Sequence, residues 1–466
     1  MLNFPNLKSK VMKDQTKKKE FLSDEQFRLA IIHHQACGID VGSTMMMVAY
    51  DDTEGNHHLL ETSAYTEDLD ELAKILKTAG VQKVAMEATG VYWMALYELL
   101  EHYGIDVTLV NPQHFKNVAG QKTDVKDCQW LHQLHAHGLL RASHIAPEVY
   151  RELRDYIHER NILQKQKSDT LNRIHKLLTL MNIKVQHLIS DIEGVSGMRL
   201  LRGIADGINN AEELLSLIDV HKLKADSADL IQSLKGNYKD QYICILKRTL
   251  QSYDFFRTQM REYEVLIEEV LKKMLPKDEQ SKEAKIKEKT SYVRKNQYSI
   301  NVKDYLRQIT GIDLTKIEGM DEINILEIIS VTGLDMNKWP TENHFASWLN
   351  LSPRPKKSGG KVIGYQQRFT KNQATQCFRM AAQTMWQNKG PLGHLYRRLS
   401  YQKGSKKAIK AVARKLAVIF YCMLKNKKEY EKNRLQINTE KHDQMKIARL
   451  IKEAAKYGLI LKNPAA

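Results

Sequence analysis

The first third of the chain alternates short apolar runs with amphipathic stretches. The β-rich apolar runs predict strands at residues 35–42, 44–52, 57–65, 81–89 and 105–111. Apolar residues at helical spacing predict helices at residues 68–80, 91–104 and 112–140. Because strands and helices that alternate in this way are typical of an α/β domain with a central sheet, we predict such a domain over residues 36–146.

The strand pattern ends at Pro147, and long helical stretches follow to about residue 275. Their apolar residues recur at intervals of three and four, which predicts a coiled coil or a helical bundle over residues 147–275. The charge-dense segment at residues 276–301 predicts a linker or a solvated helix. At the two ends we expect a basic flexible arm at residues 1–35 and a polar helical tail at residues 426–466.

A second compact region is predicted over residues 302–425, and it is mainly helical. Between Gly311 and Gly333, two glycine-bounded turns flank a short helix. This spacing suits a helix-hairpin-helix element, whose turn amides can hold a DNA phosphate, although such helix pairs also serve as ordinary packing devices. The predicted fold class is therefore α/β plus all-α.

Charge narrows the choice of partner. The 466 residues include 72 Lys and Arg against 55 Asp and Glu, which gives a formal charge of +17. An excess of this size favours a polyanionic partner, with nucleic acid as the first hypothesis and a basic protein with a solvated surface as the alternative. No run approaches the roughly 18 apolar residues that a membrane span needs, so we do not expect an integral membrane protein.

The five cysteines are scattered and form no C-x-x-C pair. They therefore predict neither a cysteine-based zinc site nor a disulfide framework, and a reducing cytoplasm is the simplest setting. The basic N-terminal segment lacks the apolar stretch of a signal peptide, which agrees with a cytoplasmic location.

Four carboxylates of the first region form a candidate metal site. Asp40 lies within the apolar run GIDVGST, where burial of a carboxylate is costly unless it has a partner, and Glu87 ends a second apolar run. Asp124 and Asp127 are three residues apart, which places both on one face of a helix. Such an oxygen-rich set suits Mg²⁺ or Mn²⁺ in phosphoryl transfer. Taken singly, Asp124 and Asp127 are also explained as ordinary surface charges on a helix. Glu87 is also explained as a strand-end residue that pairs with a lysine.

The run GIDVGST has a competing interpretation as the first phosphate loop of actin-like ATPases and sugar kinases. Those proteins need a second glycine-rich phosphate loop about 100 or more residues onward, and no downstream segment supplies one. The P-loop pattern G-x-x-x-x-G-K-[ST] is also absent. The sequence therefore favours the metal site over a nucleotide site.

Ser358 is a candidate nucleophile because glycines permit close backbone approach and neighbouring cations attract a phosphate. On the residues alone, a loop that only contacts phosphate explains the segment better. The candidate nucleic-acid contacts around Ser358 are Arg354, Lys356, Lys357, Lys361, Arg368 and Lys371. No general base is evident, since His344 is merely the nearest histidine in sequence, and a base from the first region could accept the proton if the two regions meet.

The order of the motifs GIDVGS, MEATGVYW, VNPQHFKNVAGQKTDVKDCQWL and FASWLNLSPRPKKSGGK resembles the IS110 family of insertion-sequence transposases, also called DEDD transposases. The resemblance extends from about Cys37 to Leu424. It implies an N-terminal RuvC-like domain of the ribonuclease H fold, a coiled coil that dimerises, and a C-terminal transposase domain with a nucleophilic serine.

Carried over by position, the resemblance implies a catalytic, metal-binding tetrad of Asp40, Glu87, Asp124 and Asp127, and a nucleophile at Ser358. Many relatives have a serine where this chain has Lys357. The resemblance also implies a dimer or tetramer that recombines DNA through a structured RNA. Two alternatives remain open: a RuvC-like junction nuclease that uses water, and a non-catalytic protein that bridges nucleic acids.

Overall fold

The structure is a computed structural model that describes residues 30–111, 124–276, 296–353, 355–365, 372–431 and 439–459. It divides into two compact units, Met1–Ile145 and Ala146–Ala466. Within the described ranges, no helix is both long enough and apolar enough to cross a membrane. Most of the predicted N-terminal arm and most of the predicted linker at residues 276–301 lie outside these ranges.

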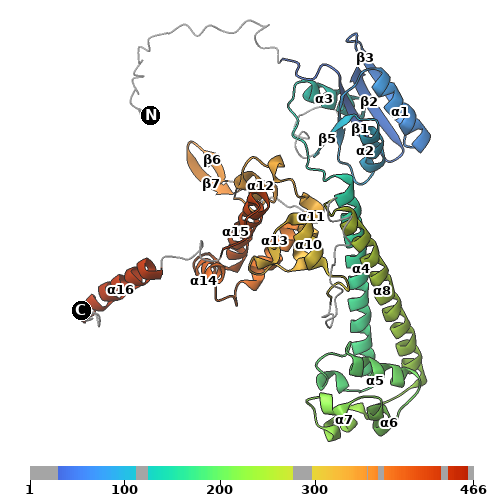
Figure 1. The fold of residues 1–466 in the computed structure, drawn as a ribbon, viewed down its shortest axis with the longest axis vertical. Helices are drawn as coiled ribbons and strands as arrows, with labels where there is room; N and C mark the ends of the chain where they lie inside the picture. The colour runs from blue at the N-terminus through green and yellow to red at the C-terminus, as the bar shows by residue number, and fades with distance from the viewer. Residues whose placement is uncertain are drawn as a thin grey trace, which may run out of the picture. The chain divides into compact units, whose positions relative to one another are not determined.

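Unit 1 is built around a five-stranded mixed sheet (Figure 1). Its strands are β1 (Ala36–Val41), β2 (Met45–Asp51), β3 (His57–Ser63), β4 (Lys83–Glu87) and β5 (Asp106–Val110). They lie in the order β3-β2-β1-β4-β5. β2 is antiparallel to both of its neighbours, whereas β4 is parallel to β1 and to β5. The predicted α/β domain with a central sheet is confirmed, with every predicted strand present.

Three helices cover the sheet of unit 1, and its two faces are packed unequally. The helices are α1 (Thr66–Thr78), α2 (Trp93–His102) and α3 (Asp124–Ala136). The α1 and α2 side has a large apolar core that includes Leu72 and Leu96. The α3 side has only a small apolar cluster of Ala85, Val110 and Leu131. Of the predicted helix at residues 112–140, Asp124–Ala136 is helical, residues 137–140 are not, and residues 112–123 lie outside the described ranges.

Gly38 allows α3 to cross directly over β1. A Cβ at this position would lie 2.3 Å from the backbone nitrogen of His132 and 2.5 Å from the backbone oxygen of Cys128. Any side chain larger than hydrogen would therefore force the backbone of α3 away from the sheet. Gly38 thus sets how closely α3 approaches the strand that carries Asp40.

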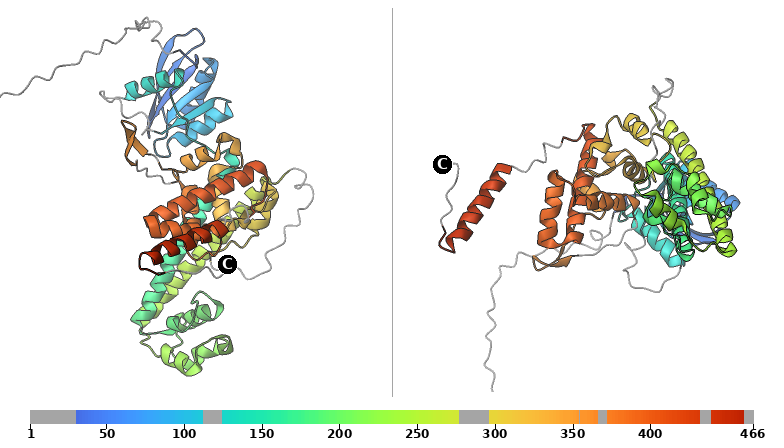
Figure 2. Two further views of the ribbon diagram at one scale, coloured as in Figure 1. Left: turned by 90° about the vertical axis from the view of Figure 1, so that its left-hand side faces the viewer. Right: turned by 90° about the horizontal axis from the view of Figure 1, so that it is seen from below.

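Unit 2 begins with a long helical pair. Glu148–Leu180 forms α4 and Asp240–Lys273 forms α8, and the two pass side by side in opposite directions (Figures 1 and 2). A buried ion pair joins them, with Arg160 Nη2 2.6 Å from Glu264 Oε1. The prediction of helices over residues 147–275 is confirmed, and the long helices pair within one chain.

A small helical head connects the far ends of α4 and α8 (Figure 1). It contains α5 (Val195–Ala205), α6 (Ala211–Ser216), α7 (Ser227–Leu234) and the short 3₁₀ turns Val185–His187 and Val220–Lys222. Its side chains form a core with the adjoining parts of the long helices, for example Leu201 with Ile174 and Leu250. The head and the adjoining ends of α4 and α8 therefore form one packed body.

The remaining helices of unit 2 share a core with the opposite end of the pair. Leu153 of α4 and Leu271 of α8 belong to the same apolar cluster as Phe345, Phe378 and Phe420. These helices are α10 (Val302–Thr310), α11 (Glu322–Thr332), α12 (Glu342–Trp348), α13 (Gln373–Thr384), α14 (Pro391–Lys403) and α15 (Ser405–Asn426), with 3₁₀ turns at Leu314–Lys316 and Met336–Lys338. The last helix, α16 (Thr439–Ala455), follows within the predicted tail.

The helix-hairpin-helix prediction falls on α10, α11 and the turn between them. Gly311 ends α10 in the left-handed conformation, with φ +73°, and Gly333 follows α11 with φ +67°. Thr310 Oγ1 lies 2.7 Å from the backbone oxygen of Leu306 and 2.8 Å from that of Ile312, so its one hydroxyl hydrogen bonds within the turn after α10. The segment therefore has the predicted pair of helices with glycines at their ends.

A β-hairpin interrupts the helices of unit 2. Pro355–Ser358 forms β6 and Lys361–Tyr365 forms β7, and the two are antiparallel. Gly359 and Gly360 connect them with φ of +52° and +76°, and two central residues with positive φ give a turn whose twist suits a two-residue hairpin. The sequence had predicted only a tight loop at this position.

Candidate active site

Asp40 and Glu87 lie next to each other at the carboxyl ends of two parallel strands. Ile39 pairs with Met86, so the next residues along β1 and β4 are Asp40 and Glu87. Side chains alternate between the faces of a strand, which puts Asp40 on the same face as Gly38, and Glu87 on the same face as Ala85. Both carboxylates therefore face α3.

The two carboxylates differ in exposure. Glu87 is 8% exposed, whereas Asp40 is half-buried. Buried carboxylates are costly unless hydrogen bonds or a cation stabilise the charge. This pair of oxygen donors at one edge of a sheet is the arrangement that the sequence predicted for these two residues.

Helix α3, which carries Asp127, begins near the strand end that carries Asp40. Burial raises the pKa of the Cys128 thiol to about 11, and the nearby negative charges of Asp40 and Asp127 act in the same direction. Cys128 thus connects the start of α3 with the strand that carries Asp40.

The fourth predicted member, Asp124, is the first residue of α3, and its side chain lies outside the described part of the chain. The ligand atoms of Asp40, Glu87 and Asp127 do not all come within 4.8 Å of one another. The structure therefore brings Asp40 and Glu87 side by side and places Asp127 on the helix that crosses β1, without closing the three carboxylates into a compact cage.

Ser358 is the last residue of β6 and is exposed, and it pairs with Lys361 across the hairpin. Lys356 and Lys357 are exposed on the same strand. Arg354, Arg368 and Lys371 lie outside the described residues. The predicted serine thus stands at the tip of an exposed basic hairpin.

His344 has a structural contact of its own. Its Nδ1 lies 2.8 Å from Thr341 Oγ1, and Thr341 caps the start of α12. This contact explains the histidine as part of a helix cap, so His344 remains without a role as general base.

Sequence reasoning missed a group formed by Asp51, His57 and His132. In the described part of the chain, it is the one set of three acidic, histidine or cysteine side chains whose ligand atoms all lie within 4.8 Å of one another. The three residues come from β2, β3 and α3 and are up to 81 positions apart in the chain, so no local spacing signals them.

Two family models match parts of the chain. Residues 37–183 match a family model for DEDD transposases of the IS110 type, described as a transposase, and residues 313–397 match the model described as Transposase IS116/IS110/IS902 family. The first match contains all four predicted carboxylates, and the second contains Ser358. A comparison with curated proteins gave no match.

Asp40, Glu87 and the start of α3 with Asp127 are called the acidic edge of the α/β unit. This unit and the two family matches define a transposase, an enzyme that acts on DNA. The chain belongs to the IS110 family of insertion-sequence transposases. The resemblance noted from the motifs is thereby confirmed. Membership of the DEDD group also implies dependence on a divalent metal ion.

Proposed function

We propose that the protein cuts and rejoins DNA strands at the ends of a mobile element, using the carboxylates of unit 1 and Ser358 of unit 2. The observation that carries the proposal is that Asp40 and Glu87 lie side by side at the ends of β1 and β4 and face α3, the helix that carries Asp124 and Asp127. Asp124, at the first position of α3, completes the proposed tetrad.

The sheet of unit 1 supports a RuvC-like domain of the ribonuclease H fold. Three antiparallel strands are followed by two parallel strands that reach the sheet through helical crossovers, in the order β3-β2-β1-β4-β5. This order places the first and fourth strands side by side at the centre. The proposed tetrad uses the ends of those two strands and a helix that crosses them.

The residues fit a hard divalent cation, because the proposed ligands are all carboxylates and Glu87 is buried. Asp40, Glu87, Asp124 and Asp127 would hold Mg²⁺ or Mn²⁺. When bound, such an ion polarises the scissile phosphate and offsets its charge. The burial of Glu87 and the close approach of α3 to β1 support this arrangement.

The proposed serine chemistry conserves the energy of the broken bond. Ser358 Oγ bonds to phosphorus while the bond from phosphorus to the 3′ oxygen breaks, which leaves a 5′-phosphoserine link and a free 3′-hydroxyl. A base in the protein–nucleic acid assembly accepts the serine proton, and the departing 3′ oxygen gains one. A different 3′-hydroxyl then attacks the phosphoserine and restores the serine.

The formal charge of +17 supports contacts with RNA as well as DNA. We propose that a structured guide RNA selects the target by base pairing, and that the chain acts as a dimer or tetramer. The proposed phosphate contacts are Arg354, Lys356, Lys357, Lys361, Arg368 and Lys371. Of these, Lys356, Lys357 and Lys361 are exposed on the hairpin that carries Ser358.

The experiment that tests this function looks for a covalent protein–DNA link. The protein, with its co-purifying RNA retained, is incubated with labelled element-end DNA and Mg²⁺ and run on a denaturing gel. We expect label on the protein for the wild type and none for Ser358→Ala. Ser405→Ala is the matched control, because Ser405 is also exposed and stands among lysines.

The pattern of products separates the alternatives. Cleaved DNA without an adduct, in equal amounts from wild type and Ser358→Ala, would support a nuclease that uses water and would remove Ser358 from the catalytic residues. Binding without any cleavage would instead support a non-catalytic bridging protein.

A further inference from the structure

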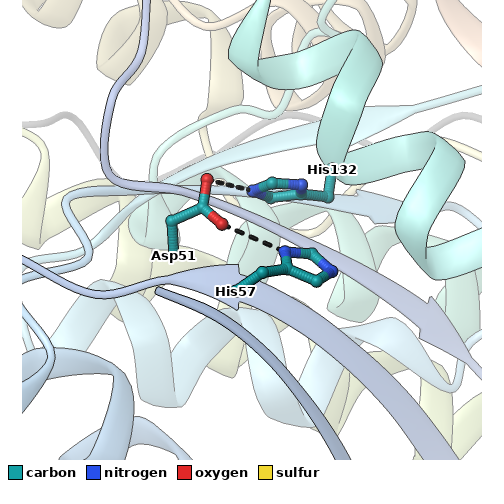
Figure 3. A group of neighbouring side chains, drawn as sticks. All are labelled: Asp51, His57 and His132. Carbon is teal, nitrogen blue, oxygen red and sulfur yellow. Dashed lines mark hydrogen bonds and ion pairs between the residues drawn. The ribbon is translucent and has the colours of Figure 1, made fainter. Parts of the chain in front are cut away.

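A second group of potential metal ligands lies on the same face of the sheet as the acidic edge. Asp51 ends β2 and pairs directly with His57, the first residue of β3, so both side chains point to one face. Ala49, two residues before Asp51, pairs with Gly38, over which α3 crosses. His132 of α3 therefore meets Asp51 and His57 from above (Figure 3).

The carboxylate of Asp51 stands between the two imidazoles. Asp51 Oδ1 is 3.0 Å from His57 Nδ1, and Asp51 Oδ2 is 3.0 Å from His132 Nε2 (Figure 3). The ring centroids of His57 and His132 are 5.1 Å apart. Three donors from three elements thus converge, with one oxygen and two nitrogens available for one ion.

His132 is the buried member of the group. It is 5% exposed, and neither of its ring nitrogens makes an aligned hydrogen bond, so the 3.0 Å approach to Asp51 lacks hydrogen-bond geometry. The nitrogens of His132 are therefore available as ligands, whereas His57 Nδ1 forms a 3.0 Å hydrogen bond with Asp51 Oδ1 that a metal ion would replace.

We propose that Asp51, His57 and His132 form a binding site for a transition-metal ion of the zinc type. Two imidazoles and one carboxylate are a donor set that Zn²⁺ and Co²⁺ accept, whereas the oxygen-only set around Asp40 suits Mg²⁺. His57 has a side chain that is 43% exposed, so the fourth coordination position opens to solvent.

This site is separate from the acidic edge. Along β1, the position opposite Asp51 lies four residues before Asp40, which corresponds to roughly 13 Å of extended strand. The site therefore shares no ligand with the proposed tetrad. Its existence does not depend on the proposed recombination chemistry.

The metal would anchor α3 to the strands. Among the described residues, the apolar cluster between α3 and its face of the sheet is small and contains Ala85, Val110 and Leu131. A metal bound by His132 on the helix and by Asp51 and His57 on the hairpin of β2 and β3 would tie the helix in place, as metals do in domains with small cores.

The test uses Co²⁺ as a spectroscopic probe with untagged, EDTA-stripped full-length protein. We expect Co²⁺ to give the visible absorption of a four-coordinate complex, Zn²⁺ to displace it, and excess Mg²⁺ to leave it unchanged. His57→Ala should weaken Co²⁺ binding at least tenfold. His58→Ala is the matched control, because His58 is the next residue, is equally exposed at 43%, and contacts Asp52 instead of Asp51.

Two further measurements test whether Co²⁺ binds at this site and not at the acidic edge. Asp127→Asn should keep the Co²⁺ signal, since Asp127 belongs to the acidic edge, and Zn²⁺ should raise the Tm of wild type and His58→Ala but not of His57→Ala. The proposal is overturned if Co²⁺ binds His57→Ala and His58→Ala equally well, if Asp127→Asn abolishes the signal, or if the wild type binds no Co²⁺.

Discussion

At the scale of single residues, Glu87 and Asp127 are held in position by different parts of the fold. Glu87 is buried at the end of a central strand, while Asp127 depends on the position of α3. Cys128 lies beside Asp127 and Asp40 and is itself buried, so its thiol packs between the helix and the strand. The acidic edge is therefore assembled from one rigid part, the strand ends, and one part that follows the helix.

Replacing Asp124 by Ala should abolish strand cleavage while leaving nucleic-acid binding nearly unchanged. The proposed role of Asp124 is to hold a metal ion, and loss of such a ligand lowers activity by roughly a hundredfold or more. Cleavage of labelled DNA and a filter-binding assay measure the two effects. Asp169→Ala, which removes an exposed helical carboxylate from α4, should change neither. Undiminished cleavage by Asp124→Ala would show that the residue is not a ligand.

His135 should make unit 1 sensitive to mild acid. Burial, followed by the positive charges of His33 and Lys83, lowers the pKa of His135 to about 4. The unfolded chain binds a proton near pH 6.5, so the free energy of unfolding falls as the pH drops from 6.5 toward 4. Between pH 6.5 and 5 the loss should be about 2 kcal/mol.

Denaturant unfolding at several pH values measures this effect. His135→Gln should reduce the slope between pH 6.5 and 5, because the substituted side chain does not titrate. His102→Gln, at an exposed histidine of α2, should keep it. An unchanged slope in His135→Gln would assign the acid sensitivity to other groups.

At the scale of elements, the crossing of α3 over β1 should be intolerant of any side chain at Gly38. Gly38→Ala would place a Cβ within 2.5 Å of two backbone atoms of α3, and backbone cannot move aside cheaply. We expect a loss of about 1–3 kcal/mol in stability and a larger loss of cleavage, because α3 carries Asp124 and Asp127. Gly364→Ala is the control, since the Cβ there meets open space.

The elements that the sequence predicted well are those with a strong apolar pattern. β1 and β4 are buried on both faces and so appear as continuous apolar runs, and the alternation with α1 and α2 identifies the sheet. The order GIDV followed by VAME also placed Asp40 and Glu87 at strand ends, and the pairing of β1 with β4 brings them together.

The features that the sequence did not reveal lack such a pattern. β6 and β7 are exposed and rich in lysine, so no burial signal distinguishes this hairpin from a loop. The group of Asp51, His57 and His132 arises only when α3 lies across β1. Long-range packing of α3 on the sheet, which no local spacing encodes, brings these three potential metal ligands together and also sets the position of Asp127.

At the scale of the whole molecule, the excess of cations should make nucleic-acid binding strongly dependent on salt. Each phosphate contact contributes about 0.9 to the slope of log K against log salt concentration. Lys357→Gln should lower that slope by about 1. Lys74→Gln should leave it unchanged, because Lys74 Nζ lies 2.6 Å from Asp70 Oδ2 and is already neutralised. A slope that is equal in all three proteins would remove Lys357 from the phosphate contacts.

The long pair of helices in unit 2 sets a fixed length. α4 has 33 residues, which at about 1.5 Å per residue extend roughly 50 Å. The core at each end and the buried pair of Arg160 and Glu264 keep α4 and α8 in register. At about 3.4 Å per base pair, that length equals about 15 base pairs of duplex, or about one and a half helical turns. Contacts of nucleic acid at the two ends of the pair would therefore lie about one and a half duplex turns apart, and adding or removing one α-helical turn would change that spacing by under two base pairs.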